Sequence, residues 1–324
     1  MKKYARAFLP LVFLFPLAYP QTTVRPLAAG LSQAKARQKT PRFLTIPFES
    51  KLVGKTLPYN VLLPLDYDKP AARGKRYPVL YLLHGLFGHY DNWITRTKLS
   101  DYAANYSMII VMPEGNDGWY TDSASVPTDK YETYVLQELI PDVQGRYRTI
   151  ETREGRAIAG LSMGGYGALK FGVKHPELFI FVGSMSGALG AAAWTENDLR
   201  GLEVIWKTLL LVFGSENSPI RQSNDVNKLY GEVPVSRIAA LPYVYLDCGT
   251  QDPLLSSSRS LAAVLFERKI PYEYRELPGT HAWLYWDAQV QEVLRVAARK
   301  LRGPAASATR KISRGFARMN ADRQ

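Results

Sequence analysis

Four continuous apolar runs constrain the fold of this 324-residue chain most strongly, because such runs are typical of strands buried on both faces of a sheet. The runs are Tyr77–Leu83, Ser107–Met112, Phe179–Met185 and Tyr243–Leu246. Helix-compatible segments alternate with them, at Thr95–Asn105, Tyr131–Tyr147, Gly165–Lys174, Ser256–Arg268 and Trp283–Leu301. This alternation predicts an α/β fold, with a mostly parallel central sheet and helices on both of its faces.

Two segments depart from this alternation. Alternating apolar residues in Phe43–Phe48 and Leu57–Leu63 predict N-terminal strands that pair antiparallel as a hairpin. Gly187–Val235 is the least regular stretch, with Trp194 and Trp206 among loosely patterned polar residues. We expect this stretch to form a cap over a pocket.

The formal net charge of +12 resides at the two ends of the chain. Residues 1–42 carry eight Lys or Arg and no acid, and residues 299–324 carry eight and one acid, so the ends hold +8 and +7 and the middle −3. Nucleic-acid binding requires cations spread over a folded face with stacking aromatics, so this distribution argues against it. We expect the Arg-rich tail either to contact an anionic membrane surface or to have no specific role.

The N-terminal end has the features of a secretory signal. Lys2, Lys3 and Arg6 precede the short apolar run Phe8–Tyr19, so residues 1–20 are predicted to be a signal peptide or an uncleaved anchor of a secreted or periplasmic protein. The basic, aperiodic residues 21–42 predict a linker, residues 43–302 a single catalytic domain, and residues 303–324 a disordered basic tail. The single cysteine, Cys248, forms no intramolecular disulfide.

Residues 158–167 read Ile-Ala-Gly-Leu-Ser-Met-Gly-Gly-Tyr-Gly and contain a G-x-S-x-G element between a strand-like run and a helix-compatible run. A chain that turns sharply from strand to helix needs small residues at Gly160 and Gly164. The serine between them then lies on a strained bend with its hydroxyl exposed. We therefore predict that Ser162 is a nucleophile.

A serine nucleophile needs a base, and the base needs an orienting carboxylate. In this strand-turn-helix setting the chain order is Ser, then Asp or Glu, then His, so only His175 and His281 qualify as the base. His175 ends the helix that follows Ser162, about 20 Å away at about 1.5 Å per residue. His281 lies in a loop after the strand candidate Tyr272–Leu277, and we predict that it is the base.

Two aspartates compete for the role of orienting acid. Asp252 lies just past the carboxyl end of the strand Tyr243–Leu246, where catalytic groups of open α/β sheets gather. Asp247 comes five residues earlier and is expected inside the turn, where an aspartate usually accepts hydrogen bonds from loop amides. We therefore favour Asp252.

An acyl-transfer site also needs two amide donors for the oxyanion. The bend at the serine directs the amide of Met163 toward the site. The second donor is expected in the loop His84-Gly85-Leu86-Phe87-Gly88, and we choose Leu86. His84 is predicted to brace this loop through hydrogen bonds to backbone groups.

With these residues in place, the chain resembles the esterase D or Putative esterase family of α/β-hydrolases, over about Phe43 to Leu301. The resemblance rests on motifs in family order, which are His84–Gly88 with Trp93, Pro113-Glu114-Gly115 with Trp119-Tyr120, Tyr131-Glu132 with Glu138–Pro141, Gly160–Gly165, Cys248-Gly249 with Asp252-Pro253, and His281 with Trp283 and Trp286. The family includes S-formylglutathione hydrolases, feruloyl and acetyl-xylan esterases and mycolyltransferases.

The resemblance implies a serine esterase that acts through an acyl-enzyme without a metal or cofactor, on small acyl, acetyl or feruloyl esters, some of them linked to carbohydrate. The export signal argues against formylglutathione, which is an intracellular substrate. Two alternatives stay open, namely acyl transfer to a sugar hydroxyl and a non-catalytic binding module. The second predicts loss of Ser162, Asp252 or His281, and the chain has all three.

Overall fold

The computed structural model describes residues 41–301. The predicted signal or anchor, nearly all of the linker and the predicted basic tail lie outside these residues. Within them, eight strands form one sheet in the order β1-β4-β6-β5-β7-β8-β9-β10. The strands are β1 (Arg42–Ile46), β4 (Tyr59–Leu63), β5 (Val79–Leu83), β6 (Ile109–Pro113), β7 (Arg156–Leu161), β8 (Phe181–Met185), β9 (Tyr243–Gly249) and β10 (Tyr272–Leu277).

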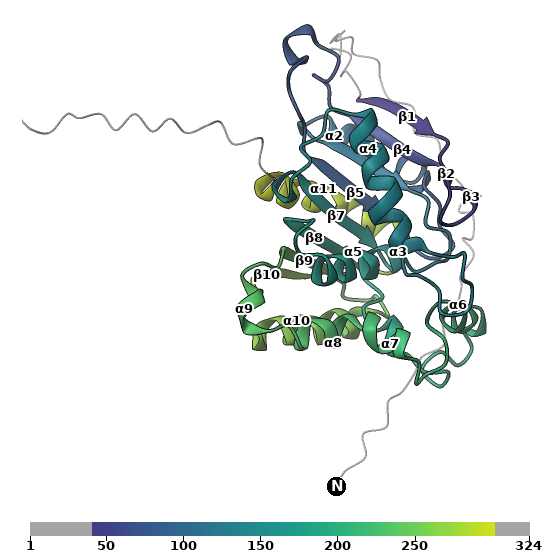
Figure 1. Ribbon diagram of the computed structural model, residues 1–324. Helices are drawn as coiled ribbons and strands as arrows, with labels where there is room; N and C mark the ends of the chain where they lie inside the picture. The colour runs from purple at the N-terminus through teal and green to yellow at the C-terminus, as the bar shows by residue number, and fades with distance from the viewer. Residues whose placement is uncertain (1–40, 302–324) are drawn as a thin grey trace, which may run out of the picture. The chain divides into compact units, whose positions relative to one another are not determined.

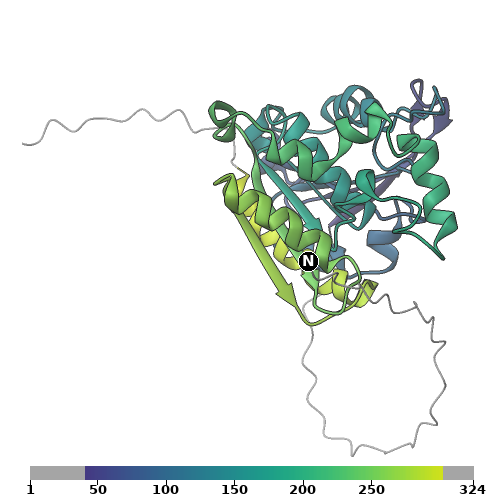
Figure 2. The ribbon, with the colours of Figure 1, turned by 90° about the horizontal axis from the view of Figure 1, so that it is seen from below.

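The pairing confirms the predicted mostly parallel sheet. Strand β4 pairs antiparallel with both β1 and β6, and every other pair in the sheet is parallel. The N-terminal strands pair antiparallel as predicted, with Leu44 opposite Val61. A separate two-stranded hairpin, β2 (Glu49–Ser50) with β3 (Lys55–Thr56), lies between them in the sequence. Figure 2 shows β10, the last strand of the sheet, at its edge beside α10 (Leu255–Glu267).

Side chains of the central strands alternate between two cores, one on each face of the sheet. In β5, Val79, Tyr81 and Leu83 point into one core, and Leu80 and Leu82 into the other. The first core is covered by helices that include α4 (Ile140–Arg146) and α5 (Met163–Lys174), and the second by α2 (Leu99–Ala103) and α11 (Trp283–Lys300), as Figure 1 shows. Because both faces are covered, a continuous apolar run was the correct signal for these strands.

The stretch with the least regular sequence pattern, Gly187–Val235, is largely helical. Its helices are η4 (Ala191–Ala193), α6 (Glu203–Phe213), α7 (Pro219–Asn224) and α8 (Val226–Gly231), and α9 (Val235–Ile238) follows. In α6, Trp206, Leu209 and Phe213 are buried at helical spacing. The sequence pattern did not indicate these helices because exposed apolar residues such as Leu211 lie between the buried positions and obscure the period.

The predicted helix Thr95–Asn105 is also wrong in detail, since the structure has two short helices, α1 (Asn92–Thr95) and α2. Between them, the Leu99 amide donates to Thr97 Oγ1, and the Lys98 amide donates to Asp287 Oδ1 at 2.7 Å. These side chains offer the backbone acceptors outside the helix, so the helix is interrupted. A second predicted helix, Tyr131–Tyr147, comprises α3 (Tyr131–Tyr134), the π-helical turn η2 (Val135–Leu139) and α4.

The remaining short helices, η1 (Pro70–Ala72) and η3 (Arg153–Gly155), lie in connections before β5 and β7. None of the helices in residues 41–301 combines the length and the hydropathy that crossing a bilayer requires.

Candidate functional site

Ser162 lies at the sharp turn between β7 and α5. Its backbone has φ 51° and ψ −117°, a strained conformation for a residue other than glycine. A Cβ atom at Gly160 would lie 2.5 Å from the carbonyl carbon of Gly164, so the strand and the helix approach too closely for any side chain there. The two glycines therefore permit the bend that leaves Ser162 partly exposed at the carboxyl edge of the sheet.

The structure brings the three predicted side chains together in one hydrogen-bonded chain. The Ser162 hydroxyl donates to His281 Nε2 at 3.1 Å, and His281 Nδ1 donates to Asp252 Oδ2 at 2.9 Å. The Asp252 side chain is fully buried and the His281 side chain is 29% exposed. An imidazole in this position can take a proton from the hydroxyl while the buried carboxylate stabilises its positive charge.

Two loops position the imidazole and its carboxylate against each other. The loop after β9 carries Asp252 and is hydrogen-bonded to the end of β10 and to the loop that follows it. The Thr250 amide donates to Leu277 O at 2.8 Å, and the Gln251 amide donates to Gly279 O at 2.9 Å. Asp252 Oδ1 also accepts the Leu254 amide at 2.8 Å, which fixes its rotamer. The distance between the acid and the base is therefore set by the backbone.

An aromatic cluster supports His281 from the other side. The Trp286 ring meets the imidazole edge to face, with the ring centroids 4.9 Å apart. Trp283 packs on Trp286 in the same manner and also on Trp93, whose indole donates to the carbonyl of Leu83. The histidine loop is thus anchored to the end of β5, next to the loop that contains Leu86.

The loop that contains Leu86 and the first residue of α5, Met163, both adjoin Ser162. A Cβ atom at Gly85 would lie 3.3 Å from the Cβ of Ser162, so the residue before Leu86 lies against the serine. Within residues 41–301, neither the Leu86 amide nor the Met163 amide donates to a protein acceptor. Met163 opens α5, where the helix dipole also favours negative charge. These two amides could stabilise a developing oxyanion.

His84 braces the loop from within, as predicted. Its Nδ1 lies 2.8 Å from the carbonyl oxygen of Gly85, and its Nε2 lies 2.9 Å from the amide nitrogen of Gly115 and 3.1 Å from Glu114 Oε1. No role was predicted from the sequence for Glu114, which is also buried here. Burial acts to raise the pKa of Glu114, but its hydrogen bond with His84 and the Asn116 amide outweigh burial and lower the pKa to about 2. Its place in Pro113-Glu114-Gly115 was the available signal.

The two rejected candidates lie elsewhere. His175 ends α5 and contacts Glu132 at 3.2 Å. The prediction that Asp247 lies in a turn and accepts loop amides is wrong, because β9 extends to Gly249 and Asp247 therefore lies within the strand. Burial raises the pKa of Asp247 to about 7, and its Oδ1 accepts a hydrogen bond from Tyr285 at 3.0 Å. Strand β9 is longer than predicted because polar Asp247 still pairs in the parallel ladder.

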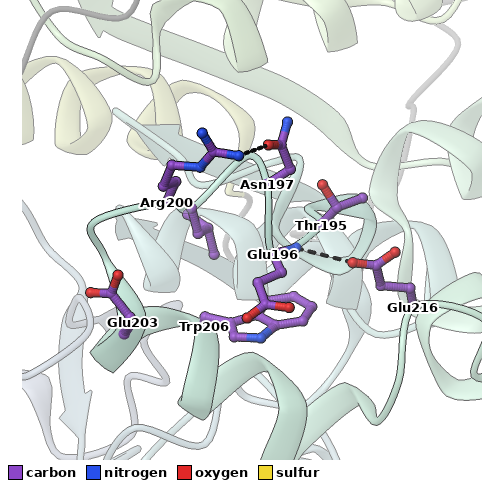
Figure 3. A pocket seen from close by; sticks show the side chains of 8 residues that line it. Thr195, Glu196, Asn197, Arg200, Glu203, Trp206 and Glu216 are labelled. Atoms are coloured by element: carbon purple, nitrogen blue, oxygen red, sulfur yellow. Dashed lines mark hydrogen bonds between the residues drawn. The ribbon is translucent and has the colours of Figure 1, made fainter.

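Other features of the described chain do not add to this constellation. A cavity of about 560 Å³ lies in the segment that contains α6, and Figure 3 shows Glu196, Trp206 and Glu216 among the side chains that line it. Neither Ser162 nor His281 lines that cavity. Residues 41–301 contain no group of three or more His, Cys, Asp or Glu side chains arranged to hold a metal ion.

Comparison with known proteins identifies the family of the chain. The profile of the family described as "Putative esterase" matches residues 50–296. An acetyl esterase of Caldicellulosiruptor saccharolyticus is 29% identical over 76% of this chain and 94% of its own length. Esterase Rv1288 of Mycobacterium tuberculosis is 31% identical over 78% of this chain, which spans 59% of that relative's length. A mycolyltransferase, Ag85A of Mycobacterium leprae, is 29% identical over 68% of this chain and 74% of its own length.

Solved structures share the fold. A ferulic acid esterase superposes with a TM-score of 0.68 at 29% identity, over 81% of this chain and 98% of that one. The serine hydrolase FphF of Staphylococcus aureus gives a TM-score of 0.70 at 23% identity, over 80% of this chain and 99% of its own, a likeness of fold alone. The predicted α/β-hydrolase fold is confirmed.

Proposed function

This chain belongs to the Putative esterase family and is an esterase enzyme, and from that premise we propose that it is an exported serine hydrolase of carboxylic esters. The substrates we propose are esters of small acyl, acetyl or feruloyl groups, some of them attached to carbohydrate. The observation that carries the proposal is the hydrogen-bonded chain from Ser162 through His281 to Asp252.

In the proposed mechanism, Ser162 Oγ attacks the ester carbonyl as its proton passes to His281 Nε2. The amides of Leu86 and Met163 stabilise the negative charge on the carbonyl oxygen, and each contributes about 3 kcal/mol to lowering the barrier. His281 returns the proton to the leaving alcohol, and the acyl group stays on Ser162. Water then attacks the acyl-enzyme, with His281 again as base, and releases the acid.

A panel of p-nitrophenyl esters of increasing acyl length, with methyl ferulate added, tests the activity on the purified protein. We expect turnover by the native chain and a loss of at least about 10⁴-fold in Ser162→Ala. Ser260→Ala changes an exposed serine of α10 and is the matched control. Equal turnover by the native chain and Ser162→Ala would remove Ser162 from the mechanism.

A second candidate function, acyl transfer to a sugar hydroxyl, is favoured by the mycolyltransferase relatives. Transfer and hydrolysis share the acyl-enzyme and differ only in whether an alcohol or water attacks it. Adding a disaccharide such as trehalose to the p-nitrophenyl ester assay separates them. Acylated sugar as the main product would favour transfer, and free acid at every sugar concentration would favour hydrolysis.

Export and membrane contact are the remaining parts of the proposal. Lys2, Lys3 and Arg6 before Phe8–Tyr19 support export as a secreted or periplasmic protein. Cell fractionation tests it, and deletion of residues 1–20 should leave the enzyme in the cytoplasm. We also propose that residues 303–324 bind anionic membrane surfaces, so their deletion should abolish membrane association and preserve esterase activity. No change in either property would end the surface role.

A further inference from the structure

Phe87 is an exposed aromatic residue in a strained backbone conformation, one position after the proposed oxyanion donor Leu86. Its φ is 59°, in the left-handed region that bulky residues rarely adopt, and 55% of the residue is exposed. A phenylalanine that faces solvent gains little from burial, so its own packing does not offset the cost of this conformation. Strain of this kind at an exposed position indicates a binding role.

A carboxylate from the neighbouring strand end holds Phe87 in place. The Phe87 amide donates to Asp117 Oδ1 at 2.7 Å, and Asp117 lies in the loop after β6, which pairs with β5. Gly88 donates its amide to Gly85 O at 3.0 Å and closes a tight turn around Leu86 and Phe87. The turn and the carboxylate together fix the backbone from which the ring projects.

The strand order tells which part of an ester lies near Phe87. Strand β5 lies on one side of β7, which carries Ser162, while β9 and β10 lie on the other side and carry Asp252 and His281. The leaving alcohol must be next to His281 Nε2, because that atom returns its proton. Because the carbonyl oxygen binds the Leu86 amide in the proposed mechanism, the carbonyl carbon and the acyl group that it carries lie beside the loop that contains Phe87.

We propose that Phe87 is a substrate-contacting residue that forms an apolar wall for the acyl group, with Asp117 as its positioning residue. The inference rests on the proposed function and narrows its substrate class to esters whose acyl group is apolar and larger than acetyl. Such a group covers the exposed ring and removes apolar surface from water, whereas an acetyl group is too short to do so.

Two ester series test this assignment. In the first, p-nitrophenyl acetate, butyrate and hexanoate vary the acyl group, and in the second, ethyl, butyl and hexyl acetates vary the alcohol. Phe87→Ala should lower the hexanoate-to-acetate ratio of kcat/KM about tenfold and leave the ratio across the alkyl acetates unchanged. Phe266→Ala is the matched control, because Phe266 is 73% exposed at the far end of α10, and it should alter neither ratio.

Variants of Asp117 separate positioning from mere stability. Asp117→Ala should lower the same ratio, and Asp117→Asn should restore it, since an amide oxygen also accepts the Phe87 amide. An unchanged acyl ratio in Phe87→Ala, or a loss that follows the alcohol series, would overturn the inference. Failure of the proposed function has a different signature, because Ser162→Ala would then retain turnover of every ester.

Discussion

The two edges of the parallel sheet differ in how many strained backbone conformations their loops contain. Seven non-glycine residues of the described chain have positive φ, and six of them lie in loops at the carboxyl edge. These are Phe87, Asn116, Trp119, Tyr120, Ser162 and Ser186. The amino edge contributes only Lys269, between α10 and β10. A strained backbone conformation persists only where the surrounding structure enforces it, and such conformations cluster at functional sites. The carboxyl edge is therefore the edge where we expect the active site.

The two edges also differ in the charged side chains that they carry and in how these are buried. At the carboxyl edge Asp252 and Glu114 are buried and hydrogen-bonded, which holds each carboxylate in one orientation. At the amino edge, a groove of about 880 Å³ has a mostly apolar lining with one acid, Glu267, and five cations, namely Arg153, Arg268, Lys269, Arg299 and Lys300. Helices α10 and α11 end there, and cations at helix C-termini favourably meet the negative end of the dipole. The amino-edge charges therefore have a structural explanation.

The largest expected effect comes from the base at the carboxyl edge. His281→Ala should lower kcat by about 10⁵-fold or more, because in the proposed mechanism the imidazole transfers every proton of the reaction. His175→Ala, a change at the far end of α5, should retain activity within about threefold. Steady-state kinetics with a p-nitrophenyl ester measures both. Comparable losses in the two variants would contradict the assignment of the base.

The next prediction concerns the two aspartates near the end of β9. Asp252→Asn should lower kcat about 10⁴-fold, because an amide no longer stabilises the imidazolium or selects its tautomer. Asp247→Asn should change kcat less than tenfold, since its carboxyl contacts Tyr285 rather than His281. If the larger loss occurred at Asp247, the carboxylate would have been assigned to the wrong residue.

Lys170, in α5, is hydrogen-bonded to the strained loop after β6 at Tyr120. Its fully buried ammonium donates to Tyr120 O at 2.6 Å and to Glu132 Oε2 at 2.7 Å. Lys170→Met should destabilise the fold by about 3–5 kcal/mol, because it leaves the Glu132 carboxylate buried without this partner. Chemical denaturation measures the loss. Lys174→Met, at a partly exposed partner of the same carboxylate, is the control and should cost clearly less.

The raised pKa of Asp247 predicts a pH dependence of stability. Burial raises this pKa from 3.8 to about 7, so the folded chain keeps a proton that the unfolded chain loses between about pH 4 and 7. The free energy of unfolding therefore falls as pH rises through this window. Relative to Asp247→Asn, the native chain should lose about 1–4 kcal/mol from pH 4 to pH 8, by denaturant titration. A difference that stays constant with pH would contradict the prediction.

The smallest effects are expected at the amino edge. Arg299→Gln should leave kcat/KM unchanged and lower the free energy of unfolding by about 0.5 kcal/mol, because it removes one cation from the last turn of α11. Activity assays and denaturation of the same preparation measure both quantities. A large loss of activity would show that the two edges are not functionally distinct.

Local patterns in the sequence predicted the features that depend on neighbouring residues. Apolar runs located β5, β6, β8 and β9, and the G-x-S-x-G element located the bend at Ser162. Chain order and strand ends then indicated His281 and Asp252, which the structure brings together. These inferences succeeded because strand burial and turn geometry depend on residues that are consecutive in the sequence.

Long-range pairing could not be predicted in the same way. Lys170 and Glu132 are separated by 38 residues, and the buried ion pair between them leaves no local pattern. Phe87 and Asp117 are joined across 30 residues, and nothing in the loop around Phe87 reveals its positive φ. Helix α6 was missed because its buried face is interrupted by exposed apolar side chains.

The central claim is that Ser162 is activated by His281 and Asp252, and covalent labelling tests it most directly. Diethyl p-nitrophenyl phosphate transfers its phosphoryl group to an activated serine and releases p-nitrophenolate. The account predicts one equivalent of p-nitrophenolate per chain, an adduct on Ser162 by peptide mass spectrometry, and labelling at least about 10³-fold slower in His281→Ala. Full esterase activity with no adduct on Ser162, or labelling that does not depend on His281, would contradict it.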